Sequence, residues 1–146
     1  MVEGRVVLTQ PNRPLRQFLA TTGSGHHLIL DDIIGGSGAK PIELVAVGLA
    51  GSAAFDVITY LRYKRFQQVT GYEVRVEAEL AENLPQVFTT VRIHHIVSGH
   101  DVDPEAVQEA IDLSNNKHGA VQAMLRPTTE LVTTFEVVSE KAAVAV

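Results

Sequence analysis

Ser52 and Asp56 are the polar pair that most readily suggests chemistry, because they interrupt a long apolar segment running from Ile42 to Leu61. A spacing of four residues puts both side chains on one face of a helix. A nucleophilic serine also needs a base within reach, and the neighbouring sequence supplies none. Ser52 does not stand in a G-x-S-x-G turn either. The favoured interpretation is structural, with the Ser52 hydroxyl bonding back to a carbonyl of its own helix.

Two histidine pairs, His26-His27 and His94-His95, offer nitrogen ligands for a metal ion. Both pairs lie in segments with the composition of strands, where adjacent side chains point to opposite faces of a sheet. Neither pair can therefore chelate one ion, and no metal site is expected. In the second pair we expect His95 to be a hydrogen-bonded core residue and His94 to face solvent.

The sequence GGSGAK at residues 35–40 lies between a predicted strand and a predicted helix, where a phosphate-binding loop would stand. That motif requires a glycine before the lysine and a serine or threonine after it, whereas Ala39 and Pro41 occupy these positions. Without the hydroxyl group magnesium coordination is lost. We interpret the segment as a flexible loop, and no cofactor is expected.

Composition limits the functions open to the chain. Its 146 residues have the length of one domain, and 45% of them are hydrophobic, enough for a core. The net charge of −5 argues against a nucleic-acid partner. The absence of cysteine excludes disulfides, thiolate metal sites and cysteine nucleophiles. No targeting segment is evident, and Glu43, Ser52 and Asp56 disfavour a membrane span, so a cytoplasmic protein without membrane contact is expected.

The first half of the chain predicts strands followed by one long helix. The three expected strands are Arg5–Gln10, Arg16–Thr22 and His27–Asp32. The helix over residues 42–61 follows Pro41, a residue suited to the first helical position. Because this helix is apolar nearly all round, we expect it to be buried, with Gly48 and Gly51 allowing another backbone to approach closely.

The second half predicts a hairpin, further helices and a last strand. Alternation over Tyr72–Leu80 and Val87–Val97 predicts two paired strands. The second strand is expected to turn these residues to one face: Val87, Val91, Ile93, His95 and Val97. A helix is expected to begin at Asp103-Pro104 and to stop at Asn115–Gly119. A short helical segment over Ala120–Leu125, a strand over Thr129–Val138 and a loose tail over Ala142–Val146 complete the prediction.

The order of motifs resembles the OsmC/Ohr family, the osmotically inducible and organic-hydroperoxide-resistance proteins. The family pattern has Pro-x-Glu-Leu, a small-residue helix with Gly-Gly-Cys and Asp, a strand ending in Val-Ser-Gly, a helix opening with Asp-Pro, and Lys-Tyr-Cys-x-Val-x-x-Met-Leu. The matching segments here are PIEL at 41–44, AGSAAFD at 50–56, VSG at 97–99, DP at 103–104 and KHGAVQAML at 117–125. The resemblance covers residues 14–138. It implies one α+β, OsmC-like domain over residues 1–146, with antiparallel sheets and two main helices in an intertwined homodimer.

The departures from the family pattern concern the reaction. The family reduces hydroperoxides with two cysteines, and the matching positions here are Ser52 and Gly119. The reaction requires a thiolate that becomes a sulfenic acid and then a resolving thiol. A chain without cysteine cannot perform these steps. In addition, Ile42 stands where the peroxidase branch has a glutamate after the proline, and either Arg13 or Arg16 corresponds to the branch's activating arginine.

Three classes of function remain for this cysteine-free, stress-response type of protein. In the first, the cleft survives as a site for a small apolar ligand, lined or bordered by Glu43, Ser52, Asp56, His118 and Gly119. In the second, Ser52, Glu43 or His118 serves a different enzymatic reaction, with His118 favoured because imidazole titrates near neutral pH. In the third, the protein is a structural relic of a hydroperoxide reductase whose dimer surface matters more than its pocket.

Overall fold

The computed structural model describes residues 1–140, which divide into two compact units at the boundary between Val45 and Ala46. The segment expected as a loose tail, Ala142–Val146, lies outside the described residues. The long helix α1, Pro41–Tyr63, crosses the boundary between the units. Each unit is described by itself below.

The first unit is built on a three-stranded antiparallel sheet of β1 (Gly4–Leu8), β2 (Phe18–Thr22) and β3 (His27–Leu30). The three predicted strands are confirmed in somewhat shorter form. The glycine-rich segment after β3 is organised by hydrogen bonds, because the Asp31 carboxylate accepts from both the backbone N–H and the hydroxyl of Ser37. These bonds hold the pKa of Asp31 below its usual range, the hydroxyl bond being the larger cause.

Helix α1 begins as predicted, with Pro41 in its first turn and the Glu43 carboxylate accepting the Lys40 backbone N–H at 2.8 Å. The expectation of an all-round buried helix is wrong for the single chain. One face is buried, including Leu49, Val57 and Leu61, whereas Phe55 on another face is 77% exposed. By length and composition alone α1 could cross a membrane, a test that core helices of soluble proteins also pass.

The second unit contains the predicted hairpin, formed by β4 (Gln68–Leu80) and β5 (Phe88–His100) in antiparallel pairing. The β5 residues Val91, Ile93 and Val97 are buried on one face, as alternation predicted. Val87 does not join that face, because a register shift pairs Leu80 with Phe88, and Phe88 is buried in its place. A bulge of this kind adds one residue to a strand and so reverses the alternation beyond it.

The third strand of this sheet corrects the expectation of purely antiparallel sheets. β6 (Glu130–Ser139) confirms the last predicted strand but pairs with β5 in parallel, so the sheet is mixed, in the order β4-β5-β6. Parallel neighbours cannot be joined by a tight turn and need a long crossover. Here the crossover contains α2 (Pro104–Leu113), the π-helical turn η1 (Ser114–His118) and α3 (Ala120–Leu125).

The crossover begins as the sequence predicts. The Asp103 side chain caps α2 by accepting the Glu105 backbone N–H at 2.9 Å. The break at Gly119 and the short helix after it are also confirmed. The break is not a left-handed glycine cap, since the φ angle of Gly119 is −72°.

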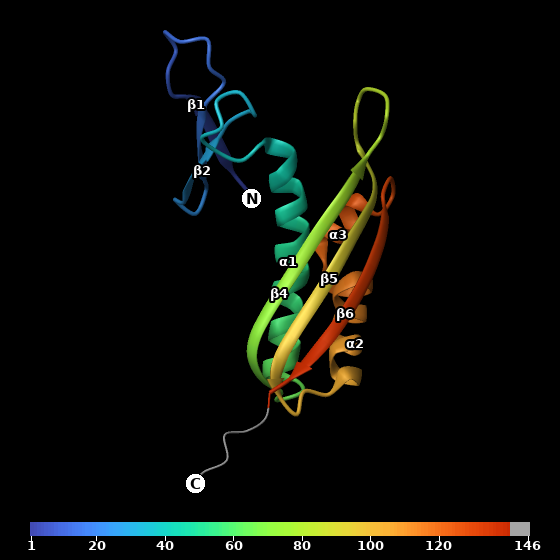
Figure 1. The fold of residues 1–146 in the computed structure, drawn as a ribbon. Helices are drawn as coiled ribbons and strands as arrows, with labels where there is room; N and C mark the ends of the chain where they lie inside the picture. The colour runs from blue at the N-terminus through green and yellow to red at the C-terminus, as the bar shows by residue number, and fades with distance from the viewer. Residues whose placement is uncertain (141–146) are drawn as a thin grey trace. The chain divides into compact units, whose positions relative to one another are not determined.

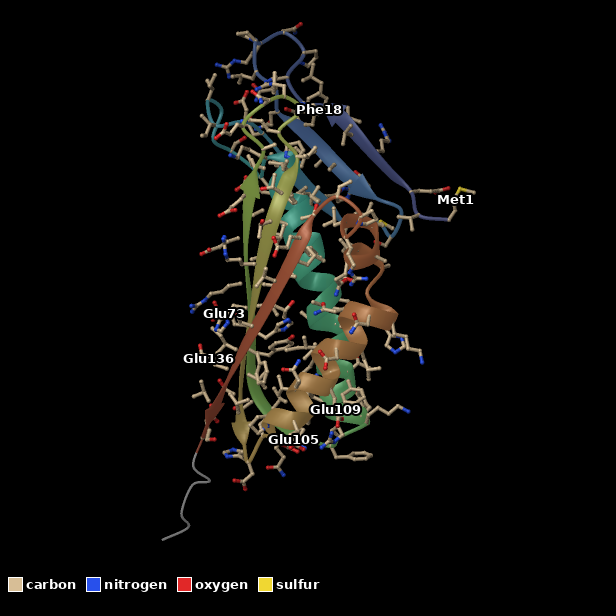
Figure 2. All side chains as sticks on the ribbon, turned by 90° about the vertical axis from the view of Figure 1, so that its right-hand side faces the viewer. Met1, Phe18, Glu73, Glu105, Glu109 and Glu136 are labelled. Carbon is tan, nitrogen blue, oxygen red and sulfur yellow. The ribbon has the colours of Figure 1, made fainter. Side chains whose placement is uncertain are left out.

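The core of the second unit lies between the helices and one face of the mixed sheet (Figure 1). One cluster joins Val57 and Leu61 of α1 to Val97 of β5 and to the apolar face of α2. A second joins Leu49 to β5, with Val121 and Leu125 of α3 packed against it. Glu73 and Glu136 point away from the helices, on the opposite face of the sheet (Figure 2). The α1 face that carries Ser52 and Asp56 is thereby held near α3 and η1.

Candidate functional site

Ser52 and Asp56 lie half-buried on one face of α1, as the four-residue spacing predicts. The Ser52 hydroxyl does not bond back to a carbonyl of its own helix, so that expectation is wrong. It donates instead to Oε1 of Gln122 in α3, at 2.9 Å. A fully buried amide 70 positions along the chain offers a neutral acceptor that the local sequence could not reveal.

The hydrogen bonds continue from Gln122 back to α1. Gln122 Nε2 donates to Ser114 Oγ at 2.9 Å, and Ser114 Oγ donates to Asp56 Oδ2 at 2.8 Å. Ser114 and Gln122 are buried. We call the four residues Ser52, Gln122, Ser114 and Asp56 the polar chain. Every hydrogen in it points toward the Asp56 carboxylate, which is its only charged member.

The direction of the polar chain limits its chemistry. The atom that accepts the Ser52 proton is an amide oxygen, which is not a base at ordinary pH. A serine nucleophile requires a neighbouring base that can take its proton. The polar chain therefore links α1 to η1 and α3 without activating the Ser52 hydroxyl.

Gly119 is coupled to the same amide. The π-helical turn closes with the Gly119 N–H donating to the Ser114 carbonyl at 2.7 Å, which sets Gly119 above the Gln122 side chain. A Cβ atom built on Gly119 would overlap the Gln122 amide group. Gln122 thus occupies the space that a side chain at position 119 would need, while it also accepts from Ser52.

A cleft of about 570 Å³ opens beside Asp56, between α1 and η1. Its lining consists of two aromatic residues, one hydroxyl residue and three charged or titratable residues: Phe55, Asp56, Thr59, Tyr60, Lys64 and His118. His118 is exposed and borders the same cleft as Asp56. We call this space the α1–η1 cleft.

Two hydroxyl groups of the α1–η1 cleft are already engaged. Thr59 Oγ1 donates to the Phe55 carbonyl at 2.7 Å, and the Tyr60 hydroxyl donates to the Glu109 carboxylate at 2.9 Å. The bond to Glu109 raises the pKa of Tyr60. No ion pair within residues 1–140 involves Asp56, Lys64 or His118. These three side chains keep hydrogen-bonding capacity for a ligand.

A pair of stacked rings, the half-buried Tyr72 and the buried His95, lies in the second unit on β4 and β5. The Tyr72 hydroxyl is 2.6 Å from Nδ1 of His95, and the two rings stack with centroids 5.9 Å apart. His95 is therefore the hydrogen-bonded core histidine that was predicted, and burial lowers its pKa to about 4. Burial, and then the negative charge of Asp56, raises the pKa of Tyr72. His94 faces the other side of the sheet, near Thr134 and Glu136.

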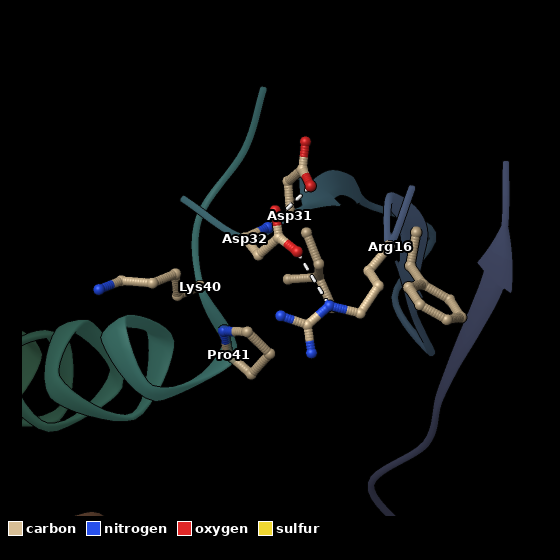
Figure 3. A pocket seen from close by; sticks show the side chains of 7 residues that line it. Arg16, Asp31, Asp32, Lys40 and Pro41 are labelled. Carbon is tan, nitrogen blue, oxygen red and sulfur yellow. Dashed lines mark hydrogen bonds and ion pairs between the residues drawn. The ribbon is translucent and has the colours of Figure 1, made fainter. Parts of the chain in front are cut away.

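The first unit has its own pocket, of about 290 Å³, beside the start of α1 (Figure 3). Arg16 lines it and pairs with Asp32 at 2.9 Å, whereas Arg13 is exposed and bonds to Gln10. The Gly35 N–H and then Arg16 hold the pKa of Asp32 below its usual range. Two of the charged residues in this pocket, Arg16 and Asp32, therefore neutralise each other, and the Asp31 carboxylate accepts hydrogen bonds from Ser37.

The structure thus brings four of the five predicted site residues into two adjoining arrangements. Ser52, Asp56 and Gly119 belong to or border the polar chain, and His118 borders the α1–η1 cleft with Asp56. Glu43 belongs to the first unit and caps α1. Sequence reasoning missed the remaining residues of the two arrangements: Phe55, Thr59, Tyr60, Lys64, Ser114 and Gln122. The four-residue spacing of Asp56, Tyr60 and Lys64 was a usable signal for the cleft.

Within the described residues no group of three or more His, Asp or Glu side chains could hold a metal ion.

Comparison with known proteins decides the family. The family model described as OsmC-like protein matches residues 34–134 of the chain. The Escherichia coli protein YhfA is 35% identical over 122 residues, which cover 84% of this chain and 90% of YhfA. The chain belongs to the OsmC-like family. The same family was identified from the sequence motifs alone.

Solved structures agree with this assignment. A hypothetical protein from Aquifex aeolicus is 26% identical and superposes with a TM-score of 0.84, covering 97% of this chain and 98% of its own. An organic hydroperoxide resistance protein OsmC from Legionella pneumophila is 14% identical, with a TM-score of 0.67 and coverage of 94% and 97%. At that identity the likeness shows the fold alone. This OsmC-like protein accordingly has the α+β fold of its family and no cysteine with which to perform thiol chemistry.

Proposed function

We propose that this OsmC-like protein is a homodimer that binds a small molecule with a largely apolar body, and that it is not a thiol peroxidase. The observation that carries the proposal is the α1–η1 cleft, which is open, partly aromatic and bordered by Asp56, Lys64 and His118, none of which forms an ion pair within residues 1–140. Clefts of a few hundred cubic ångströms, mainly apolar with a few convergent polar groups, are the usual form of small-molecule sites.

The absence of peroxidase activity is supported by the polar chain as well as by composition. The two positions that the family resemblance assigns to cysteines are Ser52 and Gly119. Gln122 accepts a hydrogen bond from Ser52 and fills the space that a side chain at position 119 would need. The site of the thiol pair is therefore closed by a hydrogen-bonded amide, which supports a role other than peroxide reduction.

The homodimer is supported by an uncovered face of α1. A groove of about 290 Å³ runs between α1 and β4, lined by Val47, Ala50, Gly51, Ala54, Tyr72, Val74 and Val76. A Cβ atom added to Gly48 or Gly51 would meet nothing within 4 Å. The two glycines leave room for a close backbone approach, and no part of residues 1–140 supplies that backbone. A second copy of the chain, as in the family's intertwined dimers, is the occupant we propose.

Native mass spectrometry of untreated protein tests the proposal. We expect a dimer with a reproducible small-molecule adduct. Phe55→Ala should lose the adduct because it removes an aromatic wall of the α1–η1 cleft, whereas Phe66→Ala, at an exposed ring outside the cleft, should retain it. A bare protein, or an adduct that persists in Phe55→Ala, would contradict binding in this cleft. A monomer would contradict the dimer.

A hydroperoxide assay tests the negative half of the proposal. With cumene hydroperoxide and dithiothreitol, the protein should consume peroxide no faster than the reductant alone. Protein-dependent consumption that survives dialysis against a metal chelator would contradict the proposal.

A further inference from the structure

Asp56 has an unusual environment for a carboxylate. It is half-buried in a helix that is otherwise mostly apolar, and among the described residues it accepts one side-chain hydrogen bond, from Ser114. No lysine, arginine or histidine within residues 1–140 forms an ion pair with it. A partly desolvated carboxylate gains most from a charged hydrogen-bond donor. Its position in the lining of the α1–η1 cleft makes that donor available from a ligand.

Lys64 provides the opposite charge in the same cleft. It stands eight residues after Asp56, just beyond Tyr63, the last residue of α1, and its backbone N–H donates to the Tyr60 carbonyl at 3.0 Å. Tyr60 lies between them at four-residue spacing and also lines the cleft. The Lys64 ammonium is exposed and has no carboxylate partner among the described residues. The cleft lining thus contains, in chain order, a carboxylate that forms no ion pair within residues 1–140, an aromatic ring, and a cation that forms none either.

We propose that the α1–η1 cleft binds a short linear zwitterion of the ω-amino carboxylic acid class, with its ammonium on Asp56 and its carboxylate on Lys64. The methylene chain of such a molecule lies along the rings of Tyr60 and Phe55. This inference rests on the proposed function, because it assigns a ligand class to the cleft in which binding is proposed.

The arrangement of charges favours a zwitterion over a ligand with one charge. A simple carboxylic acid would satisfy Lys64 but would enter a cleft that also contains the unpaired Asp56 carboxylate. A simple amine would satisfy Asp56 and leave the Lys64 end without a partner. The aromatic rings also favour an ammonium group near Asp56, since a cation is attracted to the face of a ring. The hydroxyls of Thr59 and Tyr60 are engaged elsewhere and do not compete for either end.

Isothermal titration of the full chain with four compounds of equal chain length tests the inference. The compounds are 6-aminohexanoate, hexylamine, hexanoate and hexan-1-ol. We expect 6-aminohexanoate to bind at least tenfold more tightly than any of the other three. Equal binding of hexylamine or of hexanoate would overturn the inference, because one of the two charged contacts would then contribute nothing.

Three variants locate the contacts. Lys64→Met should reduce the affinity for 6-aminohexanoate to that for hexylamine, whereas Arg62→Met, an equal charge change at an exposed residue outside the cleft lining, should leave it unchanged. Asp56→Asn should reduce it to the affinity for hexanoate. Circular dichroism melting checks that Asp56→Asn folds, and Lys64→Met keeps the test decisive if it does not. Unchanged affinity in Lys64→Met would overturn the inference.

The test also separates the inference from the proposed function. If hexan-1-ol binds as tightly as 6-aminohexanoate and Phe55→Ala abolishes both, the cleft binds apolar molecules and only the zwitterion is wrong. If none of the four compounds binds and the protein is bare in native mass spectrometry, both the inference and the proposed function are wrong.

Discussion

Gln122 connects more parts of the candidate site than any other residue described above. It is fully buried, it accepts a hydrogen bond from Ser52 and it donates one to Ser114. Its side-chain amide also stands where a side chain at position 119 would begin. A glutamine held on both sides cannot move aside without losing hydrogen bonds in a buried place, where unpaired groups are costly. The glycine at position 119 and the glutamine at position 122 therefore depend on each other.

Gly119→Ala tests this dependence. The added methyl group should displace the Gln122 amide and lower the free energy of unfolding by about 2 kcal/mol, through overpacking and lost hydrogen bonds. Urea unfolding followed by circular dichroism measures the change.

In a Gln122→Ala background the same Gly119→Ala change should cost less than half as much, because the obstructing amide is gone. Gly71→Ala is the matched control, since a Cβ there would meet only ordinary contacts with Ser98. An equal cost of Gly119→Ala in both backgrounds would show that the amide is not the obstacle.

His95 should make stability depend on pH. Burial lowers its pKa to about 4 in the folded protein, below the ordinary value of 6.5, so the unfolded chain binds this proton first. Stability is therefore complete above about pH 6.5 and is lost as pH falls toward 4. The expected loss from this residue between pH 7 and pH 5 is about 2 kcal/mol.

His95→Gln isolates that contribution, because glutamine can still bond to the Tyr72 hydroxyl but does not titrate in this range. Urea unfolding at pH 7 and pH 5 should show a smaller difference for the variant than for the natural sequence. Identical pH dependence in the two proteins would contradict a buried neutral imidazole at this position.

At the scale of elements, the ends of helix α2 show what holds the crossover in place. Asp103 caps the first turn of the helix and also pairs with Arg65 at 3.1 Å. Exposed ion pairs contribute little, whereas a side-chain cap contributes about 1 kcal/mol. The cap is therefore the larger of the two contributions made by this residue.

Asp103→Ala should accordingly lower the free energy of unfolding by about 1 kcal/mol, and Asp103→Asn should cost much less because the amide oxygen can still accept the Glu105 N–H. Asp112→Ala, at an exposed position in the same helix, is the control and should have little effect. Urea unfolding distinguishes these cases. Equal costs for Asp103→Ala and Asp103→Asn would assign the effect to charge rather than to capping.

The same elements show which parts of the fold could be predicted from sequence. The α2 cap, the start of α1 at Pro41 and the β4–β5 hairpin were predicted because their signals are local, involving residues within a few positions of one another. The parallel pairing of β6 was missed, since strand direction depends on a crossover rather than on strand composition. The misplaced Val87 has a similar cause, because a bulge leaves no trace in simple alternation.

In the candidate site, too, the features with local signals were predicted and those that depend on distant residues were missed. Helical spacing was enough to place Ser52 and Asp56 on one face. The partner of Ser52 lies 70 positions away in a separate helix, so nothing in the sequence around Ser52 pointed to Gln122. A hydroxyl in an apolar helix was therefore expected to bond locally, and tertiary packing supplied a better acceptor.

At the scale of the whole molecule, the uncovered groove between α1 and β4 bears on assembly. Gly48 and Gly51 have open space beside them, because a Cβ atom added at either position would meet nothing within 4 Å among the described residues. Replacing a helical glycine also favours the helix itself. Substitutions at these two glycines should therefore leave the fold of one chain intact but block the close approach of the proposed partner chain.

Gly51→Leu should convert the proposed dimer to a monomer while leaving the circular dichroism spectrum unchanged. Size-exclusion chromatography with light scattering measures the mass of each protein. Gly51 and Ala54 line the groove, whereas Lys117 on η1 does not. Lys117→Leu, which also adds a leucine at an exposed helical position, is therefore the control and should leave the dimer intact. A Gly51→Leu protein that remains dimeric would place the contact between copies elsewhere.

The crossover between β5 and β6 also governs the order in which the second unit can assemble. The β4–β5 hairpin closes over the short segment 81–87, whereas β6 reaches β5 only after residues 101–129 have been arranged. Long closures cost more chain entropy and slow the formation of non-local pairs. The hairpin should therefore form first, with one edge of β5 still without its neighbour. During that interval the edge is a template for a strand from another molecule, so the rate at which α2, η1 and α3 fold sets how long nascent chains are exposed to aggregation.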